Sequence, residues 1–217
     1  MSQYRAYFVP GAMDPEGTTM TKLECREAVK TEMNRPELKE MYNRIKERGC
    51  KQISFRCTVC NKDKNDRIGG AAFIPVTGSK NAIRICVNNP KVNKELIYEL
   101  LRHELVHAID DCEYVNPALS CELRICSEIR AYSFSNCYDG SPFRKIQDGS
   151  PMSRELCIKA GTYRSVRDKK GCKDLGKEII FRRIHAYYKT CAIGNDDAEN
   201  DRLPCSPYAF SGGSGGY

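Results

Sequence analysis

The sequence has no apolar run that approaches the 18 or so residues with which a helix crosses a membrane, so we expect a soluble protein or one peripheral to a membrane. It also lacks a long basic block, and its aromatic residues do not alternate with arginines as they do in proteins that stack on bases. The formal net charge of +7 is scattered along 217 residues. It predicts a solvated surface, with weak attraction to anionic lipid as the second interpretation, and no nucleic-acid partner is expected.

Residues 1–20 have neither the basic start nor the apolar centre of a secretory signal, and Asp14 and Glu16 are unlike a mitochondrial transit peptide. Thirteen cysteines nevertheless argue for disulfides and therefore for an oxidising environment. A compartment that oxidises proteins on entry satisfies both observations, and we favour the mitochondrial intermembrane space. A secreted protein whose targeting segment has been removed is the alternative.

Two kinds of local pattern follow one another along the chain. Apolar residues at helical spacing predict five helices, and short extended segments separated by glycine-containing turns predict a small antiparallel sheet. Pro75 confines the strand before it to an edge or an end, because proline donates no hydrogen bond to a ladder. Residues 138–176 are mixed and turn-rich. The expected helices are 21–33, 36–49, 92–112, 118–134 and 178–191, and the extended region 53–87 includes strands at 71–74 and 82–87.

Only three histidines are present, and two of them bracket a glutamate in the HExxH sequence that runs from His103 to His107. On the predicted third helix these histidines lie one turn apart on one face, so both imidazoles can bind one metal ion while Glu104 lies beside it. A catalytic zinc site has three protein ligands and one open position. The motif therefore predicts zinc-assisted hydrolysis, with Glu104 as general base toward water and then as proton donor to the leaving amine.

The motif does not itself supply the third ligand. The metzincin class places glycine and histidine three and six residues after the motif, and it is excluded because Asp110 and Glu113 stand there. Glu128, on the next predicted helix, has the spacing of the glutamate zincins and is the ligand we favour, whereas an ion pair with Arg124 is the alternative. Asp110 and Asp111 compete with it, although they more naturally accept the second ring N–H of a ligand histidine. A helix-terminal or solvated role for one of the two aspartates stays open.

An oxyanion-stabilising group would complete the site, and His185, Tyr132 and Tyr187 are the candidates. A lone histidine on an amphipathic helix is more often a packed or surface residue, so His185 is not included in the predicted site.

Cys57 and Cys60 form a CxxC pair, which can be half of a zinc ribbon, a redox pair or the ends of two different disulfides. The sequence has no second CxxC, which argues against the ribbon. We expect most cysteines to form a disulfide framework, and their odd number leaves at least one thiol free or used between chains.

With these residues the chain resembles the family of mitochondrial inner-membrane metallopeptidases that process a precursor of an ATP synthase membrane subunit and help to assemble that enzyme. The resemblance covers about residues 25–191. It implies the intermembrane-space side of the inner membrane, import by the disulfide relay, zinc binding by the two motif histidines, catalysis by Glu104, and a chaperone-like function independent of proteolysis. The colinear residues are Gly49-Cys50, Cys57-Thr58-Val59-Cys60, Ile85-Cys86-Val87-Asn88-Asn89, the stretch 103–112, and Cys126-Ser127-Glu128-Ile129-Arg130-Ala131.

The sequence departs from the family pattern outside the catalytic residues. Ile109 replaces a usual phenylalanine, the segment after Cys137 diverges, and three cysteines are additional, namely Cys121, Cys172 and Cys205.

We therefore predict an α+β fold, mainly helical and zincin-like, with a small antiparallel sheet and disulfide staples. An irregular arm (1–20), one metallopeptidase domain (21–205) and a flexible Gly/Ser tail (206–217) make up the chain. The expected function is that of a zinc endopeptidase of the intermembrane space, peripheral on the inner membrane, that processes or chaperones a subunit of an inner-membrane complex. Its ligands are His103, His107 and Glu128, and Glu104 is catalytic. The alternative is a non-proteolytic assembly factor, or an accessory subunit of a respiratory or ATP synthase complex, that retains the zinc site.

Overall fold

The computed structural model describes residues 20–61, 70–75, 80–113, 120–138 and 150–192. Within these residues the main elements are six helices and a three-stranded sheet, which confirms the α+β class. Apart from Met20, the predicted arm and tail lie outside the described residues, and the division into three segments stays a prediction. The elements, in chain order, are α1 (Lys22–Glu32), α2 (Pro36–Glu47), β1 (Gln52–Thr58), β2 (Ala71–Ile74), β3 (Lys80–Cys86), η1 (Lys94–Leu96), α3 (Ile97–Glu113), α4 (Cys121–Phe134), α5 (Arg154–Val166), η3 (Lys173–Leu175) and α6 (Lys177–Cys191).

The sheet is mixed, with strand order β1-β3-β2. β2 and β3 form the antiparallel pair that the sequence indicates, but β1 runs parallel to β3, so the expectation of an antiparallel sheet is wrong for one of the two pairings. β3 is buried along most of its length, as in a central strand with a neighbour on each side. Because β2 separates β1 from β3 in the chain, no tight hairpin joins β1 to β3, and the connection is long enough for parallel pairing. β2 is an edge strand and ends just before Pro75, as predicted.

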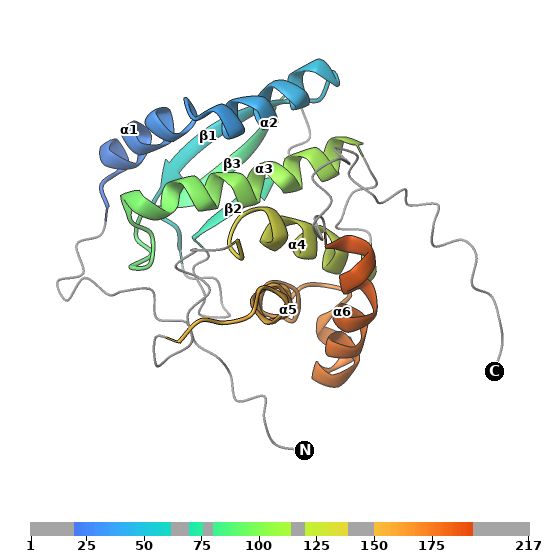
Figure 1. Ribbon diagram of the computed structural model, residues 1–217. Helices are drawn as coiled ribbons and strands as arrows, with labels where there is room; N and C mark the ends of the chain where they lie inside the picture. Colours follow the sequence, from blue (N-terminus) through green and yellow to red (C-terminus); the bar gives the residue numbers. More distant parts are fainter. Residues whose placement is uncertain (1–19, 62–69, 76–79, 114–119, 139–149, 193–217) are drawn as a thin grey trace.

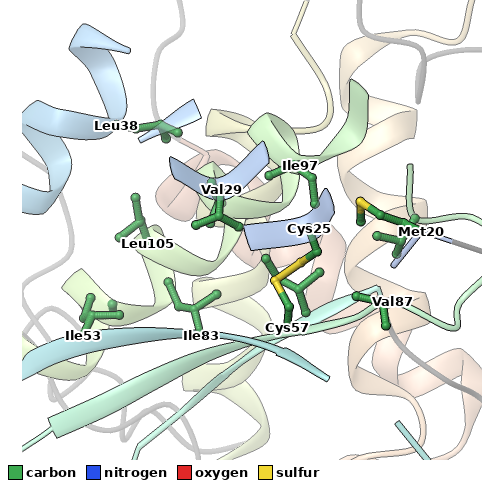
Figure 2. Packing of buried hydrophobic residues seen from close by; sticks show 14 of the residues in the cluster. Met20, Cys25, Val29, Leu38, Ile53, Cys57, Ile83, Val87, Ile97 and Leu105 are labelled. Atoms are coloured by element: carbon green, nitrogen blue, oxygen red, sulfur yellow. A yellow bond between two sulfur atoms is a disulfide. The ribbon is translucent and has the colours of Figure 1, made fainter. Parts of the chain in front are cut away.

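The sheet is covered by α1, α2 and α3 (Figure 1). Buried side chains from these helices and the strands form a first hydrophobic cluster, in which Val29, Leu38 and Leu105 lie over the sheet residues Ile53 and Ile83 (Figure 2). Because the apolar stripe of α3 faces this cluster, a second stripe of buried polar residues on α3 is left to face the opposite side.

On that opposite side α4 packs against α3, and α5 and α6 pack against α4 (Figure 1). Buried residues of α4, α5 and α6 form a second hydrophobic cluster, which shares no described residue with the first. No helix in the described part of the chain has the length and apolarity needed to span a membrane.

Helix α5 falls within residues 138–176, which the sequence indicated only as mixed and turn-rich. Its buried face consists of Cys157, Ile158, Gly161, Thr162 and Val166, so it includes a glycine and a threonine and gives only a weak apolar period. Ser153 begins the helix, because its hydroxyl accepts a hydrogen bond from the N–H of Leu156. A helix that is buried through small and polar residues escapes detection by apolar periodicity.

Twelve of the thirteen cysteines form six disulfides, which confirms the predicted framework. Cys57 and Cys60 belong to two different disulfides, which was one of the three alternatives for the CxxC pair and excludes a zinc ribbon or a redox pair. Two of the cysteines that depart from the family pattern pair with each other, and the third, Cys205, lies outside the described residues. The bonds are Cys25–Cys57, Cys50–Cys112, Cys60–Cys86, Cys121–Cys172, Cys126–Cys191 and Cys137–Cys157.

Replacement of Gly161 by alanine should destabilise the protein, because a Cβ atom there would lie 2.6 Å from a ring carbon of Tyr132. Helix propensity alone would favour alanine by up to about 1 kcal/mol, whereas overpacking costs about 1–3 kcal/mol, so the sign of the change is informative. Denaturant unfolding of Gly161→Ala measures it. The control is the same substitution in a Tyr132→Ala background, where the clash is removed and Gly161→Ala should become neutral or stabilising. Equal destabilisation in both backgrounds would contradict this account.

Candidate metal centre

The polar stripe of α3 and the facing side of α4 bring together the three predicted ligands. One nitrogen of His103, one of His107 and a carboxylate oxygen of Glu128 all lie within 4.8 Å of one another. His103 Nε2 is 3.2 Å from His107 Nε2 and 3.4 Å from Glu128 Oε2, and His107 Nε2 is 3.6 Å from Glu128 Oε1. Glu128 therefore faces the two imidazoles, and no ion pair joins it to Arg124 among the described residues.

These spacings fit a metal ion. Ligand atoms about 2.0–2.1 Å from a tetrahedral zinc ion stand about 3.3–3.4 Å apart, close to the distances between the three groups. One buried oxygen of Glu128 also accepts no hydrogen bond from any described residue. Two imidazole lone pairs and a carboxylate that converge in a largely buried space repel one another unless a cation or a proton lies between them. The group can therefore hold a metal ion.

The orientation of His107 is set by a serine that precedes the third ligand in sequence. Ser127 Oγ lies 2.8 Å from His107 Nδ1 and donates a hydrogen bond to Asp110 Oδ2 at 2.5 Å. Because its proton is directed to Asp110, Ser127 accepts from the Nδ1–H of His107, and this network assigns the tautomer with a bare Nε2. Asp110 is 1% exposed and is also paired with Arg130 at 2.9 Å.

Asp110 was expected to accept directly from a ligand histidine, and it reaches His107 through Ser127 instead. Asp111 makes no contact with either ligand histidine among the described interactions, and its carboxylate lies 3.5 Å from Asn81 Nδ2.

His103 is oriented in the same way by the residues that end α4. Its Nδ1 lies 3.0 Å from Asn136 Oδ1 and 3.2 Å from Ser135 Oγ. The amide oxygen of Asn136 can only accept, so the network again places the ring proton on Nδ1 and leaves Nε2 for a metal ion. Both candidate ligand histidines thus have polar partners that fix the ring, as is usual at metal sites.

The third ligand is supported from α5. Ser165 helps to lower the pKa of the Glu128 carboxyl group, and its hydroxyl lies 3.1 Å from the hydroxyl of Tyr132. Burial raises the pKa of Glu128, but the neighbouring His107 and His103 outweigh it and lower this pKa to about 2. Burial lowers the pKa of His107 to about 4. Burial also lowers the pKa of His103, but the neighbouring Glu128 outweighs it and raises this pKa. Glu128 and His107 are therefore in the forms that bind a metal ion, whereas a metal ion that binds His103 displaces a proton from it.

Glu104 lies between the ligand group and the sheet. It is 6% exposed, and its Oε2 accepts a hydrogen bond of 2.6 Å from the backbone N–H of Phe73 in β2. Burial raises the pKa of Glu104 to about 7, although the charge of His103 opposes the change. A carboxyl group with this pKa can both accept and donate a proton near neutral pH.

Of the three oxyanion candidates, only Tyr132 lies at the site, with its ring edge-on to His103 at a centroid distance of 4.7 Å. His185 is exposed on α6, where its Nδ1 lies 2.7 Å from Lys159 Nζ, and Tyr187 packs against the second hydrophobic cluster. Sequence reasoning missed Ser127, Asn136 and Ser165, because serine and asparagine are common in helices and turns. The position of Ser127 directly before Glu128 was the only local signal.

Comparisons with known proteins agree that the chain is similar to peptidases. The family described as "Peptidase M76 family" matches residues 23–196, a range that includes the three ligand residues and Glu104. The human "Mitochondrial inner membrane protease ATP23 homolog" is 25% identical over 192 residues, which cover 86% of this chain and 72% of the relative. The "Mitochondrial inner membrane protease ATP23" of Vanderwaltozyma polyspora is 34% identical over 132 residues, 59% of this chain and 48% of the relative. No solved structure matches the chain.

Substitution of Ser127 by alanine should weaken metal binding by about 10- to 100-fold, because His107 loses the group that orients its ring. Competition with a chromogenic zinc chelator measures the affinity. The matched control is Ser133→Ala, which removes another buried serine of α4 whose hydroxyl donates to the Ile129 carbonyl at 2.7 Å, away from the ligands. If the two variants bound zinc equally well, Ser127 would have no orienting role.

Proposed function

The chain belongs to the peptidase M76 family, and from this premise we propose that it is a zinc-dependent endopeptidase with His103, His107 and Glu128 as ligands and Glu104 as general base. The observation that carries the proposal is the convergence of these three ligand groups beside a buried carboxyl group whose pKa is raised to about 7. Two imidazoles and one carboxylate, with space for water, are the donor set of hydrolytic zinc sites.

The residues of the chain divide the chemistry between them. A bound zinc ion supplies a Lewis acid, which polarises the substrate carbonyl and acidifies water. Glu104 takes a proton from the attacking water and then gives it to the leaving amine, and its raised pKa suits both steps. Ser127 and Asn136 hold the imidazoles so that their Nε2 atoms stay available.

An extended substrate segment has a place beside Glu104. β2 is the edge strand on the side of α3, and its residue Phe73 directs its N–H away from β3 toward the Glu104 carboxylate. Extended peptides bind by adding a strand to such an edge. The contact between Phe73 and Glu104 supports β2, rather than β1, as the strand that aligns the peptide at the general base.

For location, we propose the intermembrane-space side of the mitochondrial inner membrane, with peripheral attachment. Both relatives are named as mitochondrial inner membrane proteases, and the six disulfides favour an oxidising compartment. The proposed partner is a protein substrate, a subunit of an inner-membrane complex, which the protein processes or chaperones.

A second candidate is a non-proteolytic assembly factor, or an accessory subunit that retains the zinc site. The observation that favours it is the placement of the ligands on two helices from different hydrophobic clusters, because a metal ion bound there would contribute to structure even without cleavage.

Replacement of Glu104 by glutamine should lower peptide cleavage by about 10²- to 10⁴-fold, because the isosteric amide cannot take the proton from water. Zinc content should stay at one ion per chain, since Glu104 is not a ligand. Cleavage of a peptide library and elemental analysis measure the two quantities. Glu128→Gln should lower both, and Glu178→Gln, an exposed residue of α6, should change neither. Zinc-free wild-type protein that is folded and oxidised would overturn the proposal.

The two candidate functions separate in cells that lack the protein. If cleavage is the required activity, Glu104→Gln will fail to restore assembly of the inner-membrane complex, just as Glu128→Gln does. If the structural role is sufficient, Glu104→Gln will restore assembly and only Glu128→Gln will fail. Blue-native electrophoresis of the complexes measures the outcome, with protein level checked by immunoblot.

A further inference from the structure

We propose that the metal centre has a second function, which is structural. It links two halves of the molecule, each of which has its own disulfides, while no disulfide among the described residues joins one half to the other. The first half is the described part of residues 20–113, and the second half is the described part of residues 120–192. The inference rests on the metal site of the proposed function but not on cleavage.

The disulfides divide between the halves without crossing. Three bonds join cysteines within the first half, and three join cysteines within the second. A disulfide stabilises by restricting the unfolded chain between its own ends. Oxidation therefore stabilises each half, but it places no covalent restraint on how the described halves dock.

The apolar cores divide in the same way. The first hydrophobic cluster contains residues between Met20 and Ile109, and the second contains residues between Cys121 and Cys191. Each half thus has its own buried core, and the halves meet mainly where α3 packs against α4 (Figure 1).

The seam between α3 and α4 is rich in polar groups. Most of the buried polar residues in the described part of the chain lie on these helices or at their ends, among them Glu99, Asp110, Arg130 and Asn136. Asp110 pairs across the seam with Arg130, and Glu99 accepts a hydrogen bond of 2.6 Å from Tyr138. Buried polar pairs add little net stability, because both partners lose water when the seam closes.

The metal ligands straddle this seam. His103 and His107 belong to the first half, and Glu128 belongs to the second. The groups that orient the two imidazoles, Asn136 and Ser127, also come from the second half. The ligand set is complete only when the halves are docked, so binding of the ion and docking stabilise each other. At free zinc 100-fold above its dissociation constant, the undocked population should fall about 100-fold.

Scission of the chain between the halves tests the proposal. A protease recognition sequence is placed within residues 114–119 of the full-length chain, and the folded, oxidised, zinc-loaded protein is cut. Non-reducing denaturing electrophoresis should show two separate fragments, and a covalent link between them would overturn the proposal. In native size-exclusion chromatography the fragments should co-elute with zinc and separate after chelation. Co-elution that persists after complete removal of zinc would also overturn it.

Point variants of the same cut protein test whether association of the two fragments depends on the ligand Glu128. Glu128→Gln should release the fragments even with zinc, whereas Glu104→Gln, which keeps all three ligands, should leave them associated. Separation in both variants, or in neither, would contradict the proposal.

The uncut wild-type protein gives an independent measurement that does not depend on the variants. Calorimetry should show one unfolding transition with zinc and two separate transitions after chelation, with all six disulfides intact. A single transition in the absence of zinc would show that the halves are coupled without it. Zinc-dependent association in a protein with no cleavage activity would support this inference while refuting the peptidase, so the two failures are distinguishable.

Discussion

The packing of α4 against α3 is the contact on which the site depends. Each helix carries part of the proposed ligand set on a face that also contacts the other helix, and neither can complete the set alone. The first hydrophobic cluster holds α3 on the sheet and directs its polar stripe outward, while the second positions α4 with Glu128 toward that stripe. Two ordinary apolar cores therefore serve to place a small group of polar atoms that would repel one another in isolation.

Two carboxyl groups in this site, one buried and one partly buried, have opposite properties because their neighbours differ. The imidazoles of His107 and His103 lower the pKa of Glu128 to about 2, despite its burial. Glu104 is more affected by burial than by its neighbours, and its pKa rises to about 7. The first group is thereby suited to ligation and the second to proton transfer, although the two side chains are chemically identical. Environment, rather than residue type, assigns the roles.

The sequence predicted the helices of this chain where apolar residues kept a regular spacing. It also predicted which three side chains converge, because HExxH fixes two positions and Glu128 lies on the following helix. It failed where burial used small or polar residues, as in α5, whose Gly161 accommodates the Tyr132 ring. It also failed for β1, because strand pairing with β3 is decided by contacts distant in sequence. The roles of Ser127, Asn136 and Ser165 could not be predicted for the same reason, because the partner of each residue lies on another element.

The hydrogen bond from Phe73 to Glu104 has a consequence for solubility. An edge strand presents backbone donors and acceptors that can pair with another chain, and proteins guard such edges with charged groups or covering elements. Here Glu104, the proposed general base, accepts from one of the outward donors of β2. The residue that would act on a bound peptide thus also guards the edge while no peptide is bound, and any strand from a second copy must displace a buried carboxylate to pair there.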